Sequence, residues 1–502
     1  MPKFVFLATD VALFALLAGL ALYVWHVRRT PNLRATWRSV FRDAPAMCAL
    51  VLLCAFLLLA VLDSIHFRPL LPKAEGAAAD APHAYSTRAY SVLDRLLAKP
   101  LEGTEKTYSA PLAYLQFTKE SFEVDGKPVR DYPRLAFGGA HLKDPPRQRA
   151  GDIAMRSIAG LAAGAIGGLL LAALVVAARG RAVGQGFGAS ARAVWRRETD
   201  VPWRAILATL IALALLAGGV AALWARYHVL GTDRTGNDVL YQALKSVRTA
   251  IVIGSLATLA TLPFAISLGI LAGYFKGWAD DAIQYLYTVL SSIPGVLLIA
   301  ACVLIIQVTI DKYPDLYETG LERADLRLLL LCVVLGVTGW ATLCRLLRAE
   351  TLKLSELDYV QAARAFGVSH LGIMRRHIFP NVMHVVLIVA VLDFSGLVLY
   401  EAVLSYVGVG VDPTTASFGS MFNLARTEMS RDPAVWWNLL AAFIFMLALV
   451  LSANLFAGSV REAFDPRARA FRPRLAHRPS SHASTGQRQG EGKTLPASRG
   501  TA

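Results

Sequence analysis

The chain contains a series of apolar runs, each long enough to cross a lipid bilayer as a helix. A hydrocarbon core about 30 Å thick requires roughly 20 helical residues. The runs lie at 4–25, 45–63, 154–178, 204–224, 248–275, 283–309, 327–347, 383–404 and 436–460. Because backbone groups inside lipid must satisfy one another, these runs predict an all-α polytopic membrane protein with about nine transmembrane helices.

The basic residues indicate the orientation of these helices. A net charge of +15 would also suit a nucleic-acid-binding protein, but the arginines gather after the first, third and seventh runs and in the C-terminal tail. These segments lie on one side of the membrane if the runs alternate, as the positive-inside rule requires. The pattern predicts an outer N-terminus and a cytoplasmic C-terminus, and it gives no reason to expect a nucleic-acid partner.

The runs and the polar segments between them divide the chain into five predicted parts. The segment between the second and third runs is either an extracytoplasmic lobe or a partly ordered linker, and it contains Asp125-Gly126, a typical hairpin-turn pair. The basic tail is predicted to be disordered and to contact anionic lipid. The parts are 1–63 with N-terminal spans, 64–152 outside, 153–200 with an extra span and a basic loop, 201–465 with a six-span core, and 466–502 as the tail.

The sequence predicts neither a catalytic centre nor a metal site. Five cysteines lie in or beside the apolar runs and form no CxxC pair, which argues against a metal site and a disulfide framework. The tail sequence GQRQGEGKT resembles a phosphate-binding loop, but Gln487 occupies the position of its first glycine. We therefore expect a non-catalytic chain that binds no cofactor of its own.

Few ionisable residues are expected inside the membrane, and those few are candidates for the transport pathway. The clear cases are Asp393 and Glu401, because an acid within a span is costly unless it has a role. Glu401 lies near the outer end of its run, so an interfacial position is expected; a hydrogen bond between helices is the structural alternative for Asp393. Pro263 and Pro294 are predicted to kink their spans, and Pro294 is a third pathway candidate.

The segment DYVQAARAFGVSHLGIMRRHIFPN is polar, although apolar runs flank it on both sides. Its first half predicts a helix in which Ala362 and Ala363 would allow another surface to approach closely. Gly367 is a typical residue for ending that helix, and Ser369 is a typical cap for the next one. Pro380 is suited to the start of the following span.

The second half of the segment predicts a short amphipathic helix across the cytoplasmic face. Leu371, Met374 and Ile378 would form its apolar side, and Arg375 and Arg376 its basic side. An exposed helix of this kind suits the docking of a partner protein. The alternative is a helix that rests on lipid.

These residues resemble a motif of a known family. The sequence QAARAFGVSHLGIMRRHIFP is similar to the EAA loop of ABC importer permeases; Gln361 replaces the first glutamate, whereas Ala362, Ala363, Gly367, Ile378 and Pro380 match. HVLGTDRTGNDVL resembles the outer signature of the second, C-type permease of dipeptide, oligopeptide and nickel importers. Its matching residues are Gly231, Thr232, Asp233, Gly236 and Asp238, and Asn237 replaces a common arginine. Together with EAVLSYVGVGVDPTTASFGSM, the resemblance covers about residues 195–470.

The resemblance implies a permease subunit in the cytoplasmic membrane of a bacterium. A second permease would complete the pathway, and an extracytoplasmic peptide-binding protein would deliver the substrate. Two ATP-binding subunits, which hold ATP and Mg²⁺, would dock on the EAA loop through Gln361, Ala362, Ala363, Gly367, Ser369, Arg375, Arg376, Ile378 and Pro380. The alternatives are a nickel or other small-solute importer and, from a different class, a secondary carrier that needs no ATPase. An intramembrane hydrolase would need a paired nucleophile and base, and the sequence offers none.

Overall fold

The computed structural model describes residues 3–70, 85–86, 89–97, 104–124, 127–313 and 319–464. The predicted tail and the Asp125-Gly126 turn lie outside these residues. The longer helices are α1 (Ala8–Arg29), α3 (Ala44–Asp63), α5 (Pro145–Val183), α7 (Trp203–Trp224), α8 (Val239–Phe275), α9 (Gly277–Ser292), α10 (Gly295–Lys312), α11 (Gly320–Gly339), α12 (Ala341–Ser355), α15 (Phe379–Val407) and α17 (Trp437–Phe464). The shorter helices are α2 (Pro31–Val40), α4 (Val92–Leu97), α6 (Phe187–Trp195), α13 (Asp358–Ala365), α14 (His370–Ile373) and α16 (Phe418–Glu428).

The predicted class, an all-α polytopic membrane protein, is confirmed. Within the described residues, eight helices are long and apolar enough to cross a membrane, and α11 with α12, bent by 42°, makes a ninth. The strands are short: β1 (Lys3–Val5), β2 (His66–Arg68) and β3 (Tyr90–Ser91) form one antiparallel sheet, and β4 (Glu120–Val124) pairs with β5 (Lys127–Asp131).

Several spans differ from their predicted bounds, and α5 and α8, for example, each begin nine residues earlier than predicted. The run 283–309 is not one helix, because the chain breaks between α9 and α10 at Ile293 and Pro294. The residue before a proline avoids helical angles, and Ile293 is extended at φ −86° and ψ 130°. The proline therefore separates two helices rather than kinking one. The run from 327 bends at Trp340, and the first helix starts at Ala8 because strand β1 precedes it.

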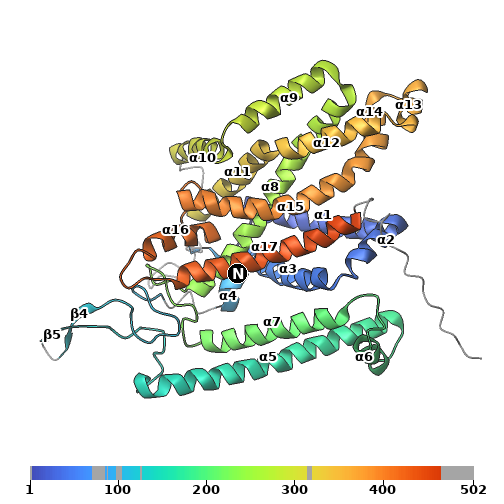
Figure 1. The fold of residues 1–502 in the computed structure, drawn as a ribbon. Helices are drawn as coiled ribbons and strands as arrows, with labels where there is room; N and C mark the ends of the chain where they lie inside the picture. The colour runs from blue at the N-terminus through green and yellow to red at the C-terminus, as the bar shows by residue number, and fades with distance from the viewer. Residues whose placement is uncertain are drawn as a thin grey trace, which may run out of the picture. The chain divides into compact units, whose positions relative to one another are not determined.

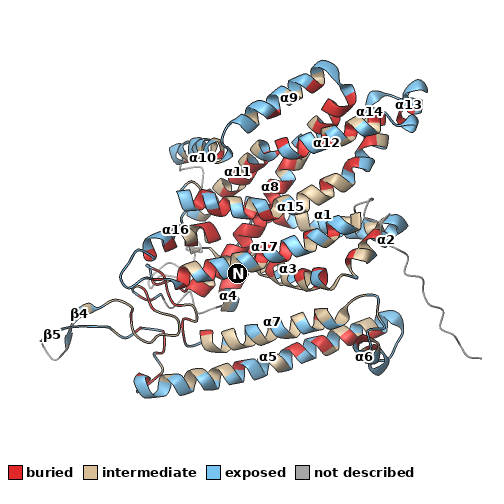
Figure 2. Ribbon diagram, in the orientation of Figure 1, coloured by how far each residue is buried: buried red, intermediate tan, exposed pale blue. Residues whose placement is uncertain are grey.

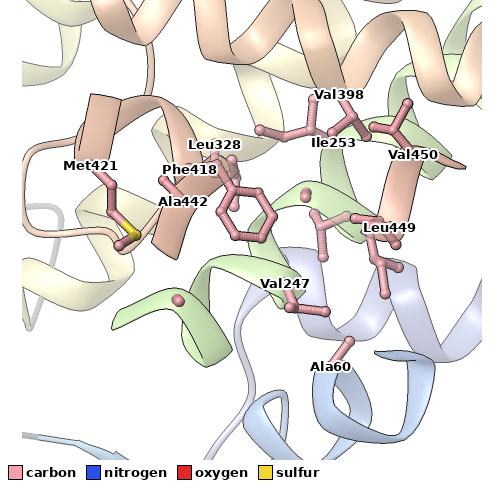
Figure 3. Packing of buried hydrophobic residues seen from close by; sticks show 14 of the residues in the cluster. Ala60, Val247, Ile253, Leu328, Val398, Phe418, Met421, Ala442, Leu449 and Val450 are labelled. Carbon is pink, nitrogen blue, oxygen red and sulfur yellow. The ribbon is translucent and has the colours of Figure 1, made fainter. Parts of the chain in front are cut away.

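Helix α8 lies at the centre of the helical packing. It contacts α3, α11, α12, α15 and α17, and it is buried over much of its length (Figures 1 and 2). Apolar side chains of four helices meet around it, with Val247 and Ile253 of α8 close to Ala60, Val398 and Leu449 (Figure 3).

Glycines of α8 allow two of these neighbours to approach closely. A Cβ atom on Gly269 would lie 2.8 Å from the Cβ of Leu347 in α12, and one on Gly254 would lie 2.7 Å from the ring of Phe394 in α15. Lipid chains are as apolar as the side chains they surround, so close packing of this kind holds membrane helices together.

Helices α5 and α7 form a second closely packed pair (Figure 1). Gly160, Gly164 and Gly168 recur every fourth residue on α5 and face α7; a Cβ on Gly164 would lie 2.5 Å from the carbonyl oxygen of Ala214. Helix α7 also contacts α3. The extra span α5 is therefore attached to the first span of the predicted six-span core.

Helix α8 carries a buried charge near its N-terminal end that the sequence analysis does not single out. Arg248 is only 7% exposed, and its guanidinium donates hydrogen bonds to Asp10 (2.5 Å), Thr9 (3.0 Å) and Ser64 (3.0 Å). Asp325 of α11 lies 3.7 Å away. Helices α1, α8 and α11 and the end of α3 thus meet at one buried guanidinium.

A second basic residue extends this cluster by one helical turn. Lys245 donates to both oxygens of Asp94 (2.8 and 3.1 Å) and lies 3.5 Å from Asp63. His66 of β2 is 2.9 Å from Asp10. We define the buried ion cluster as Asp10, Asp63, His66, Asp94, Lys245, Arg248 and Asp325. Apart from Asp94, which belongs to the polar segment 64–152, its members lie at or near the ends of apolar runs, where the sequence does not distinguish interfacial from buried charges.

The α5–α7 contact predicts different effects for two glycines of one helix. Gly164→Val should destabilise the protein by about 1–3 kcal/mol because the new side chain overlaps the α7 backbone. Gly167→Val is the matched control, since no described atom lies within 4 Å of its Cβ position. Thermal unfolding in detergent measures both variants, and equal stability would contradict the packing described here.

Removal of the central guanidinium should be costly. Arg248→Ala leaves Asp10 and Asp325 buried without their partner, so we expect a loss of about 3–5 kcal/mol. Lys353→Ala removes a basic residue whose side chain is 66% exposed in its ion pair with Glu350, and it should change stability by less than about 1 kcal/mol. The midpoint of thermal unfolding would show the difference.

Candidate functional site

We define the coupling segment as residues 358–381, which comprise α13, α14, a π-helical turn at Met374–Ile378 and the start of α15. Gly367 ends α13 with φ +76°, a conformation that favours glycine. The N–H of Val368 donates to Ala363 O and that of Gly367 to Arg364 O, both at 3.1 Å. This pair of bonds is a Schellman motif, so the predicted bend at Gly367 is confirmed.

The predicted short second helix is wrong as a separate element. Ser369 does cap α14, since its Oγ accepts a hydrogen bond from the N–H of Gly372 (3.3 Å). However, α14 continues through the π-helical turn into α15 without a break. The basic residues Arg375 and Arg376 therefore lie in the π-helical turn of this continuous helix, and Pro380 is the second residue of α15.

The outward face of the coupling segment differs from the predicted face. Ala363 and Ile378 are buried against Val360, Ile373 and other residues of the chain's own core, so neither is free to contact a partner. Gln361, Ala362, Arg375 and Arg376 are exposed as expected. Phe366 is 87% exposed and Leu371 72%; Phe366 was missed, although an aromatic residue next to the helix-ending glycine was a visible signal.

The coupling segment is held by the inner end of α8. The Tyr274 hydroxyl lies 2.9 Å from His370 Nδ1, and Lys276 forms an ion pair with Glu356 just before α13. Behind it, a Cβ on Gly273 would lie 2.6 Å from Thr351 of α12. These contacts from α8 and α12 make the segment part of the packed helices rather than a free loop.

The outer motif, residues 228–238, caps the other end of α8. Asp238 accepts hydrogen bonds from the Tyr241 N–H (3.1 Å) and Trp224 Nε1 (3.0 Å) and lies 2.8 Å from His228 Nδ1. Asp233 accepts from the N–H groups of Thr235 and Asn237, both at 2.9 Å. Because these carboxylates are buried and bonded within the chain, they organise a turn.

Residues 104–124 and 127–142 form a lobe that packs on the outer motif. Gly231 and Gly236 have φ of +71° and +79°, and a Cβ on Gly236 would lie 1.8 Å from the carbonyl oxygen of Glu105. The N–H of Thr232 donates to the carbonyl oxygen of Ser109 (3.1 Å), and the N–H of Ser109 donates to Thr232 Oγ1 (2.7 Å). The buried motif residues Gly231, Thr232 and Gly236 therefore form the seat of the lobe.

Glu105 fixes the interior of the lobe. Its carboxylate accepts hydrogen bonds from the N–H groups of Ala136, Phe137 and Gly138 at 2.9–3.0 Å and lies 3.4 Å from His228 Nε2. Burial opposes ionisation, but the bonds from His228 and the three N–H groups outweigh it and lower the pKa of Glu105 to about 2.

The three pathway candidates do not form one site. Glu401 is 1% exposed and accepts a hydrogen bond from Ser405 Oγ (2.7 Å), so protein atoms enclose it. A Cβ on Gly419 would lie 2.9 Å from its Oε1, which shows how closely α16 approaches. Asp393 is half-buried on the same helix, α15, and lies about 12 Å from Glu401 along the helix axis. Pro294 lies at the start of α10, next to Gly295, which faces the Tyr400 hydroxyl.

Residues 228–238 and 358–381 thus lie at opposite ends of one long helix, α8. Residues 265–470 match the family described as binding-protein-dependent transport system inner membrane component. The oligopeptide transport system permease protein OppC of Mycobacterium tuberculosis (strain ATCC 25618 / H37Rv) is 31% identical over 245 residues, which is 49% of this chain and 78% of the relative. The chain belongs to this permease family.

Other relatives carry related descriptions. The glutathione transport system permease protein GsiD of Pectobacterium atrosepticum is 29% identical over 54% of this chain and 93% of its own length. The di/tripeptide transport system permease protein DppC of Pseudomonas aeruginosa is 30% identical over 48% and 72%. The inward-facing MetNI methionine ABC transporter aligns with 45% of this chain and 96% of its own chain, at 17% identity and a TM-score of 0.34.

The low pKa of Glu105 predicts an acid-sensitive lobe. The folded value of about 2 lies below the ordinary 4.5, so this carboxylate stabilises the lobe above pH 4.5 and loses that effect as the pH falls from 4.5 towards 2. The contribution at neutral pH is about 3 kcal/mol. The protection factors of amides in residues 104–142, which account for the slower intrinsic exchange in acid, should fall across this window.

The matched comparison uses two glutamates of the outer segment. Glu105→Gln should expose the lobe to exchange already at pH 7 and flatten its pH dependence. Glu123→Gln, on the exposed strand β4, should leave the protection of the lobe unchanged. An unaltered acid profile in Glu105→Gln would contradict the assignment.

Proposed function

We propose that this chain is the C-type permease subunit of an ATP-driven peptide importer and forms half of its translocation pathway. The peptide specificity rests on relatives described as oligopeptide, dipeptide and glutathione permeases. Nickel or another small solute on the same machinery is the second candidate, and a secondary carrier is the third. The chain itself is non-catalytic under this proposal, and ATP with Mg²⁺ is bound by its partners.

The observation that carries the proposal is the exposed face of the coupling segment. Phe366 and Leu371 present large apolar side chains there, next to the charges of Arg375 and Arg376. Isolated exposed apolar residues are common, but two of them on a fixed turn, with basic neighbours, suit a protein partner. Two cytoplasmic ATP-binding subunits, one on this chain and one on a second permease, are the proposed occupants.

The contacts of α8 suggest how such a partner would act. The coupling segment is attached to the inner end of α8, and the lobe rests on its outer end. A displacement of the segment by an ATP-binding subunit would therefore be passed to the outer face as the movement of packed helices. An extracytoplasmic peptide-binding protein would deliver substrate at that face.

Substitutions on the exposed face test the coupling. Phe366→Asp and Leu371→Asp should reduce co-purification of the ATP-binding subunits and peptide uptake at least about tenfold, the effect of losing one contact of roughly 1.4 kcal/mol. Phe6→Asp changes an equally exposed aromatic residue at the outer end and should have no effect. If both segment variants retain partner and uptake, the docking proposal fails.

The turn itself supplies a second test. Gly367→Val forces a β-branched residue into the left-handed conformation, whereas Gly367→Asn is tolerated there. We expect uncoupled transport in the first and near-normal transport in the second, with both proteins present in the membrane.

Uptake of labelled peptides by vesicles, measured beside uptake of Ni²⁺, also separates the two substrate candidates.

A further inference from the structure

We propose that the inner end of α1, together with α2 and α6, is a binding site for an anionic phospholipid. The acyl chain would lie in a groove of α1, and the headgroup phosphate would contact arginines at the end of that groove. This site goes beyond the proposed transport function, and its test does not require transport.

The groove runs along one face of α1. It is lined by Leu17, Leu20, Ala21, Val24, Trp25 and Arg28, and it has a volume of about 360 Å³. The lining residues all belong to α1, and Leu20, Val24 and Trp25 are well exposed, so the groove is open at its side. From Leu17 to Arg28 it extends about 16 Å, which matches the hydrocarbon depth of one leaflet.

Cationic side chains stand where a headgroup would lie. Arg28 ends the groove, and the guanidinium of Arg29 lies 3.9 Å from the ring centre of Trp25. Tryptophan favours the depth of the headgroups, and a guanidinium presents paired donors that match phosphate oxygens. The order of apolar groove, tryptophan and arginines follows the order of acyl chain, interface and phosphate in a phospholipid.

Helices α2 and α6 extend this basic surface. Asp200, after α6, forms ion pairs with Arg38 of α2 and with Arg42 (2.9 Å for Arg42), which brings the two helices together. Trp195 of α6 is 74% exposed, and Phe187 is also exposed, as in helices that insert into an interface. Arg28 and Arg29 of α1, Arg34 and Arg38 of α2 and Arg192 of α6 are all exposed.

The surface lies at the same end of the helices as the coupling segment. The ring of Trp37 in α2 is 5.6 Å from that of Phe464, the last residue of α17. Helix α17 begins at Trp437, whose indole donates to Thr232 O in the outer motif, so its last residue lies at the opposite, inner end. The positive surface therefore faces the leaflet that carries the anionic lipids of the cytoplasmic side.

The test uses the full chain, purified with its partner subunits in a zwitterionic detergent. Phosphatidylglycerol should raise the midpoint of thermal unfolding in a saturable manner, and phosphatidylcholine with the same chains should not. The double variant Arg28→Gln/Arg29→Gln should bind phosphatidylglycerol about tenfold more weakly, as native mass spectrometry would show. Arg130→Gln/Arg147→Gln removes the same charge from exposed positions of the outer segment and should bind normally.

Two further arms separate a lipid site from a general attraction of anions to the basic surface. Ala21→Trp fills the groove at an exposed position and leaves the arginines intact, so it should also weaken phosphatidylglycerol binding. Inorganic phosphate at the same concentration should produce no shift, because it cannot occupy the groove. Three results would each overturn the proposal. They are unchanged lipid affinity in both Arg28→Gln/Arg29→Gln and Ala21→Trp, a purely non-saturable response to phosphatidylglycerol, and an equal effect of inorganic phosphate.

Discussion

The guanidinium of Arg248 is the interaction on which the arrangement of the N-terminal spans depends. In lipid, apolar surfaces gain little by meeting one another, since the solvent is itself apolar. A buried guanidinium is different, because separating it from Asp10, Thr9 and Ser64 would leave charges in hydrocarbon. The buried ion cluster thus fixes α1 and the end of α3 against α8, whereas the glycines of α5 and α8 contribute through close packing against neighbouring helices.

Helix α8 gives this arrangement a functional direction. Its 37 residues extend about 55 Å, from the seat of the lobe at Asp238 to the contact between Tyr274 and His370. Helix α8 thereby makes three kinds of contact in order along its length. Its N-terminal end contacts the lobe, its next turns contact the buried ion cluster, and its C-terminal end contacts the coupling segment. Under the proposed function the chain is driven from one face and receives its cargo at the other, and that would require a stiff connection of this sort.

The sequence was most informative where the physics is local. The apolar runs gave the span class, and the bend at Gly367 with its cap Ser369 followed from residues only a few positions apart. The orientation of Ile378 was predicted wrongly because the π-helical turn shifts the phase of the following residues by about 100° relative to an α-helix. The ion pair of Asp10 and Arg248 joins residues 238 positions apart in the chain, and no local sequence pattern predicts it.

The same long separation has a consequence for how the protein is made. Asp10 enters the membrane with the first helix, long before ribosomes have synthesised Arg248. Glu105 is likewise synthesised before Gly236, whose backbone its carbonyl oxygen approaches closely. Until α8 is inserted, the acid of α1 has no guanidinium to neutralise it and is best accommodated at the bilayer surface. Insertion of α8 is then the event that draws the earlier spans into place, so the N-terminal third of the chain matures only after the core has begun to assemble.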